Sequence, residues 1–197
     1  MGEPLRAHTI NEVRYYLMVT VCQACGKGPR ILDAIQPPGK SGQYARAETH
    51  CKNCQDRQDV DFICDEELTP SAPESDIISP TDEPSPTIDL GQWLSLFYLL
   101  VETAATETSP PLTRRLGFRA ALCLAEGLKF FGPDDELPPE SAFFTPDTLA
   151  AFRKHPEKFA KQKLRDMQAK LPSMGTMARR VARDEESRRR RWWQFWR

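Results

Sequence analysis

The sequence contains little that would support catalysis. Its 197 residues include three histidines, His8, His50 and His155, which are widely separated and fall in different predicted regions. The chain has no Ser-His-Asp order, no phosphate-binding loop and no dinucleotide-binding fingerprint. These absences favour a protein that is not an enzyme.

Long hydrophobic runs and export signals are also missing. The longest strongly apolar run, Trp93 to Val101, is shorter than the about 20 residues that a membrane-spanning helix needs. Residues 1–14 lack the apolar core of a secretory signal peptide, and Arg6 stands where a myristoylation signal has Ser or Thr. We therefore expect a cytoplasmic protein, in a reducing setting where paired cysteines more often bind metal than form disulfides.

The net charge of −1 hides an uneven distribution of charged residues. The segments 1–60, 61–90, 91–171 and 172–197 carry net charges of +2, −9, +1 and +5. An acidic connector and a basic tail therefore flank a nearly neutral region of helical character.

Four of the six cysteines form two C-x-x-C pairs with 25 residues between them: Cys22, Cys25, Cys51 and Cys54. Two residues between thiols allow one tight turn to aim both sulfurs at a single ion, and two such pairs are typical of a four-thiolate zinc site. Gly26 and Gly28 can supply the positive φ that such a turn often needs. Because four thiolates would leave no open coordination position, the Zn²⁺ would have a structural role.

The alternative chemistry for these cysteines is thiol redox. A thioredoxin-like C-x-x-C lies at the start of a helix, which lowers the pKa of its thiol. Here Gly26, Gly28 and Pro29 follow the first pair and oppose helix formation, and two pairs are present where redox chemistry needs one. Zinc is therefore favoured, and a C-x-x-C thiol-redox enzyme stays as the alternative.

Four segments around the cysteine pairs are predicted to be strands. Residues 11–21 run directly into Cys22 and are rich in β-branched and aromatic residues, and the others are Ile31 to Gln36, Gln43 to Thr49 and Asp59 to Cys64. We call each C-x-x-C turn a knuckle. The order strand, knuckle, strand, strand, knuckle, strand resembles the zinc-ribbon superfamily. That resemblance implies a zinc-ribbon-like domain over residues 1–67, and it indicates metal binding without indicating a function.

Nucleic acid is an alternative partner for such a module. Basic residues that could contact phosphates and tyrosines that could stack on bases surround the cysteine pairs: Lys27, Arg30, Lys40, Arg46, Lys52 and Arg57, with Tyr15, Tyr16 and Tyr44. The module has a net charge of only +2 and the acidic segment follows it directly. An ordinary surface of mixed charge is therefore preferred to a nucleic-acid interface.

The rest of the chain divides into a linker, a helical domain and a tail. Residues 68–88 are acidic and rich in proline, a composition typical of a disordered linker. Residues 89–172 are predicted to form a small α-helical domain, with Asp89 and Thr145 as helix N-caps. The predicted fold class is thus α+β.

The tail, residues 173–197, ends in a cluster of arginines and aromatic residues. The candidate contact residues are Arg188, Arg189, Arg190, Arg191, Trp192, Trp193, Phe195 and Trp196. They suit docking into a partner protein, contact with an anionic membrane, or folding back onto the chain's own helical domain. We interpret the whole chain as a non-enzymatic zinc-binding adaptor whose most favoured partner is another protein. A location at the periphery of a membrane stays as an alternative to the cytoplasm alone.

Overall fold

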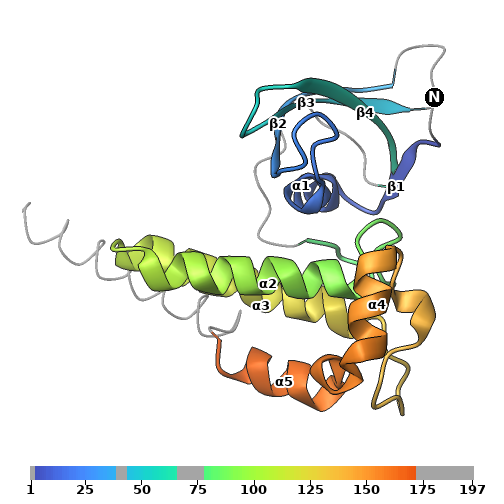
Figure 1. Ribbon diagram of the computed structural model, residues 1–197, viewed down its shortest axis with the longest axis vertical. Coiled ribbons are helices and arrows are strands. Elements are labelled where there is room, and N and C mark those ends of the chain that lie inside the picture. The colour runs from blue at the N-terminus through green and yellow to red at the C-terminus, as the bar shows by residue number, and fades with distance from the viewer. Residues whose placement is uncertain (1–2, 39–43, 66–77, 172–197) are drawn as a thin grey trace, which may run out of the picture.

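The computed structural model describes residues 3–38, 44–65 and 78–171. These residues form a four-stranded sheet and five α-helices, which confirms the mixed α and β content (Figure 1). In chain order the elements are β1 (Leu5–Ala7), α1 (Ile10–Val19), β2 (Arg30–Gln36), β3 (Ala45–Cys51), β4 (Arg57–Cys64), α2 (Leu90–Thr106), α3 (Pro110–Leu128), the 3₁₀ turn η1 (Glu140–Ala142), α4 (Pro146–Lys154), the 3₁₀ turn η2 (Pro156–Phe159) and α5 (Lys161–Ala169).

The sheet has the strand order β1-β4-β3-β2. β2, β3 and β4 form an antiparallel meander, while the three-residue β1 runs parallel to β4. β2, β3 and β4 confirm three of the four predicted strands, with bounds shifted by one or two residues. On β3 the residues Ala45, Ala47, Thr49 and Cys51 are buried and alternate with more exposed ones, so one face of this central strand points into the protein.

The prediction of a strand over residues 11–21 is wrong, because Ile10–Val19 is the helix α1. Thr9 caps this helix by accepting a hydrogen bond from the backbone N–H of Glu12 at 3.2 Å. Val13 and Leu17 pack on the sheet, while Tyr15 joins the core of the helical region. The β-branched and aromatic residues that favoured a strand therefore cover two opposite sides of a helix lying between two layers (Figure 1).

The helical region is built around α2 and α3, which are joined by a short loop. Trp93 of α2 is fully buried in this core, and α4 and α5 pack beside the pair (Figure 1). Asp89 forms the predicted N-cap of α2 through a capping box with Gln92, and Thr145 caps α4, which begins at Pro146. Local capping signals thus located both helix starts correctly.

Part of the predicted linker is packed against the rest of the protein. Residues 68–77 lie outside the described residues, but Ile78 and Ile88 are buried in the helical core. The Thr9 hydroxyl donates a hydrogen bond to the carbonyl oxygen of Ile78, and the Thr87 hydroxyl donates to that of Arg6. The expectation of disorder is therefore corrected for residues 78–88, which contact both the sheet-bearing part and the helices.

Candidate metal centre

The two cysteine pairs come from adjacent positions at one end of the sheet. Cys22 and Cys25 lie in the loop between α1 and β2, Cys51 is the last residue of β3, and Cys54 lies in the turn before β4. The start of β2 lies beside the end of β3, because Arg30 pairs with Cys51 in the antiparallel ladder. Strand pairing thus brings together two turns that are far apart in the sequence.

Both turns have the same backbone geometry. In the first, the N–H of Gly26 donates to the carbonyl oxygen of Cys22 at 2.8 Å, and Gly26 has a φ of 68°. In the second, the N–H of Gln55 donates to the carbonyl oxygen of Cys51 at 2.9 Å, and Gln55 has a φ of 62°. A left-handed residue directly after the second cysteine therefore closes each knuckle.

Gly28 has a different role from the one that the sequence suggested. Its φ lies outside the left-handed region, and a Cβ at this position would be 3.0 Å from the backbone oxygen of Thr20. The chain therefore needs glycine here for a close backbone approach rather than for a positive φ.

The four cysteine sulfurs form a compact cluster. The Sγ atoms of Cys22 and Cys54 are 3.7 Å apart, as are those of Cys25 and Cys51, and all four lie within 4.8 Å of one another. A tetrahedral ion with metal–sulfur bonds of about 2.3 Å would separate its ligands by about 3.8 Å. The geometry of the cluster therefore fits a four-thiolate metal site. Within the described residues, it is the group of metal-ligating side chains whose ligand atoms lie close enough together to hold one ion.

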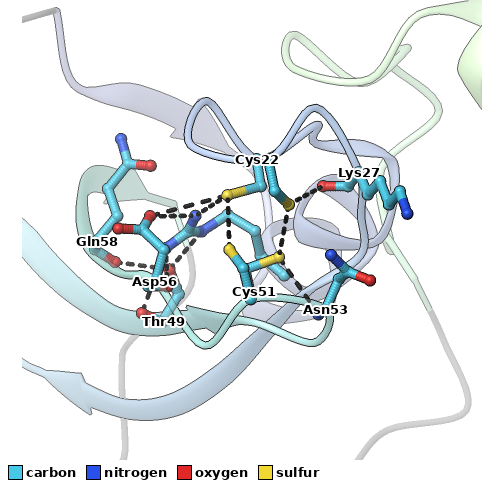
Figure 2. A network of polar contacts seen from close by, with 10 residues as sticks. Cys22, Lys27, Thr49, Cys51, Asn53, Asp56 and Gln58 are labelled. Atoms are coloured by element: carbon cyan, nitrogen blue, oxygen red, sulfur yellow. Dashed lines mark hydrogen bonds and ion pairs between the residues drawn. The ribbon is translucent and has the colours of Figure 1, made fainter.

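The surroundings shift the pKa values of Cys51 and Cys54 in opposite directions. The backbone N–H of Cys54 lowers the pKa of Cys51 to about 6, and the N–H of Asn53, which is 3.4 Å from the sulfur, acts in the same direction (Figure 2). The backbone N–H of Asp56 favours the thiolate of Cys54, but desolvation and hydrogen bonding with the other thiols raise its pKa to about 12. Four thiolates this close need a cation to offset their charge, and binding a divalent ion would release the remaining protons.

The geometry lacks the features of a thioredoxin-like pair. Sulfur contacts of 3.7 Å join each cysteine of one knuckle to a cysteine of the other, so the four thiols form one cluster rather than two separate pairs. Each pair is also followed by a strand, β2 or β4, so neither pair lies at a helix N-terminus as a thioredoxin-like pair does.

The other cysteines and the neighbouring histidine lie apart from the cluster. Cys64 is half-buried and donates to the carbonyl oxygen of His8 at 3.6 Å, and burial raises the pKa of Cys123 far above its ordinary value. His50 adjoins Cys51 in sequence, but its Nδ1 lies 2.7 Å from an oxygen of Asp33. Its ring is thus paired with a carboxylate on β2.

Three of the predicted nucleic-acid contact residues, Arg30, Arg46 and Tyr15, contact other residues of the protein. Arg30 is 2% exposed, and Arg46 pairs with Asp61 at 2.8 Å. Tyr15 is buried against Trp93, while Tyr44 is exposed and Lys40 lies outside the described residues.

Arg30 and Asp56 are the site residues that the sequence analysis missed or misread. The guanidinium of Arg30 lies beside the cluster and donates to the Cys22 sulfur at 3.6 Å, and it also donates to Asp56, which follows the second knuckle. Arg30 is the first residue of a predicted strand, and nothing in its sequence neighbourhood marks it as buried.

The aromatic and arginine-rich tail, residues 173–197, lies outside the described residues. Among the helices that the structure describes, none is both long and apolar enough to cross a membrane.

The fold and the site together define a protein of mixed α and β structure with a four-cysteine cluster of metal-binding geometry. No protein-family model matches the chain, and comparisons with curated proteins and with solved structures give no match.

Proposed function

We propose that the chain is a non-enzymatic adaptor whose N-terminal part is stabilised by one structural Zn²⁺. The observation that carries the metal assignment is the cluster of four sulfurs within 4.8 Å, two pairs of which are separated by the distance expected for tetrahedral coordination. Cysteine sulfur is a soft ligand, and a set of four thiolates favours zinc over calcium or magnesium. The proposal places the protein in a reducing compartment such as the cytoplasm, because the thiols must stay reduced to bind the ion.

A structural role follows from the number of protein ligands. Four cysteines complete a tetrahedral shell, so neither water nor substrate can reach the metal. The sheet also has a small core of its own, consisting of Ala7, Val13, Leu17, Ala45, Ala47 and Phe62. A metal that ties the α1–β2 loop to the end of β3 would add stability that this core cannot supply alone.

The adaptor part of the proposal concerns recognition of another protein. Tyr98, Leu99 and Leu112 of the helical pair are large apolar residues with 45–48% of their surface exposed. The sequence adds a tail in which four arginines precede three tryptophans and a phenylalanine, residue types that are enriched at binding hot spots. An anionic membrane or a nucleic acid would use the same basic and aromatic chemistry, and the binding experiments in the Discussion separate these partners.

The test of the metal assignment is elemental analysis of the reduced, purified full-length protein. We expect one zinc per chain, and we expect Cys51→Ser to lose the metal and lower the melting temperature. Cys64→Ser is the matched control, because it changes a half-buried cysteine outside the cluster and keeps a hydroxyl donor for the carbonyl oxygen of His8. A metal-free protein with a normally folded sheet would contradict the assignment.

A further inference from the structure

A single arginine lies buried between the two cysteine knuckles. Arg30 begins β2, and only 1% of its side chain is exposed. Burying a guanidinium is unfavourable unless its charge is paired and its N–H groups find acceptors. The residue therefore needs an explanation in terms of what its positive charge contacts.

The guanidinium of Arg30 contacts the first knuckle, the residue that follows the second knuckle, and the strand β3. Its Nη1 donates to the Sγ of Cys22 at 3.6 Å and to Oδ2 of Asp56 at 3.4 Å. Its Nη2 donates to the backbone oxygens of Asp56 and Thr49 at 3.1 and 3.5 Å, and its Nε donates to the Thr49 hydroxyl at 2.9 Å. Figure 2 shows these contacts converging beside Cys22, Asp56 and Thr49.

The charges around Cys22 explain why a cation is needed at this position. Four thiolates and one Zn²⁺ carry a net charge of −2, and Asp56 adds another negative charge. Oδ2 of Asp56 lies 3.8 Å from the sulfur of Cys22. Once Cys22 is a thiolate it has no proton to donate to that carboxylate, so the two anions repel each other, and Nη1 of Arg30 lies within reach of both.

We propose that Arg30 is a positioning residue for the metal: it offsets the excess negative charge of the four-thiolate site and holds the Cys22 sulfur in its coordinating position. This role rests on the proposed zinc function. A lysine would supply the charge but not the fork of donors that reaches Cys22, Asp56 and Thr49 together.

A double-mutant cycle separates this electrostatic role from a purely structural one. Arg30→Met removes the charge and the donors while keeping an apolar stem, and we expect it to weaken zinc binding about 10- to 100-fold, as loss of an outer-shell partner typically does. Asp56→Asn removes the repelling carboxylate. In the Arg30→Met background we expect Asp56→Asn to restore most of the lost affinity.

The measurements are zinc affinity by competition with a chromophoric chelator, and the thiolate-to-cobalt charge-transfer band after loading with Co²⁺. The band should shift in Arg30→Met, because the Cys22 sulfur no longer accepts a hydrogen bond. Arg57→Met is the matched control. Arg57 is an exposed arginine at the start of β4, beside the same end of the sheet, and its replacement should leave both readings unchanged.

Asp56→Asn in the wild-type background keeps the proposal testable if Arg30→Met does not fold. We expect this variant to bind zinc at least as tightly as the wild type, because it removes a negative charge beside a thiolate. A loss of affinity in Asp56→Asn, or wild-type affinity in a folded Arg30→Met, would overturn the role of Arg30 and leave the zinc site intact. A wild-type protein that binds neither Zn²⁺ nor Co²⁺ would instead overturn the proposed function, and the role of Arg30 with it.

Discussion

Tyr15 of α1 lies against Trp93 of α2, with the ring centroids 5.7 Å apart and the planes inclined by 51°. Arg119 of α3 lies over the same tyrosine ring, 5.2 Å from its centroid, and its Nε donates to the tyrosine hydroxyl at 3.0 Å. This contact joins the layer that carries the cysteine cluster to the helical core. Residues 78–88 also join the two parts, because the hydroxyl of Thr9 donates to the carbonyl oxygen of Ile78, whose side chain is buried in the helical core.

We expect Tyr15→Ala to destabilise the protein by about 3–5 kcal/mol, because it removes a large buried aromatic side chain from the junction. The measurement is urea unfolding followed by far-UV circular dichroism, which reports on the sheet and the helices together. Tyr44→Ala is the control, since Tyr44 is 44% exposed and its loss should change the free energy of unfolding little. If Tyr15→Ala lowers the free energy of unfolding no more than Tyr44→Ala does, the junction does not contribute to stability.

We expect Gly26→Ala to lower stability by about 1 kcal/mol through the backbone alone. Gly26 has a φ of 68°, and a Cβ built there meets no atom within 4 Å, so steric overlap contributes nothing. The measurement is the melting temperature of the metal-loaded protein. The control is Lys27→Ala, at the exposed next position, which should leave the melting temperature unchanged. An unchanged melting temperature in Gly26→Ala would contradict the left-handed conformation of this residue.

Glu12 is predicted to make the stability of the protein depend on pH. The side chain is fully buried, and this burial raises the pKa of its carboxyl group even though it accepts a hydrogen bond from the N–H of His8 at 2.6 Å. Burial likewise raises the pKa of Glu126, which pairs with Lys129 at 2.8 Å in the same cluster. A carboxyl with a raised pKa in the folded state stabilises most at low pH, and that stability is lost as the pH rises through the raised value.

We therefore expect Glu12→Gln to flatten the fall in the free energy of unfolding that occurs as the pH rises above 4.5, the ordinary pKa of a glutamate carboxyl. Urea unfolding at several pH values measures this slope for the variant and the wild type. The control is Glu102→Gln, at an exposed position of α2, which should leave the slope unchanged. Parallel curves for Glu12→Gln and the wild type would rule out Glu12 as the source of the dependence.

The tail prediction separates a protein partner from a membrane or a nucleic acid. We expect the full-length chain to capture a protein from native lysate, and a chain lacking residues 188–197 to lose most of that capture at unchanged zinc content. Binding that requires anionic vesicles or nucleic acid, and that weakens as salt screens the arginines, would contradict the protein partner. Co-sedimentation with neutral and anionic vesicles, and a gel-shift series at two salt concentrations, supply these comparisons.

Local signals in the sequence predicted the elements that depend on neighbouring residues. The capping box of Asp89 and the Thr145-Pro146 start of α4 each rest on contacts within about four residues, so the sequence was sufficient for them. The pattern from Thr9 to Glu12 is a signal of the same kind, and it could have identified α1 as a helix. The β-branched and aromatic residues led instead to the prediction of a strand. Strand propensity depends on what each side of a segment packs against, and the sequence does not give this packing.

The sequence by itself favoured a tight turn at the cysteine pairs over a helix start, because two C-x-x-C pairs are present and Gly26, Gly28 and Pro29 oppose a helix after the first pair. Only the tertiary structure decided that the two turns meet, since this depends on the antiparallel pairing of Arg30 with Cys51. It also decided the position of the Arg30 side chain, which a linear sequence presents as one basic residue among many. Contacts between residues far apart in the chain carry no local signature, so burial, charge pairing and the assembly of the four sulfurs appear only in the folded protein.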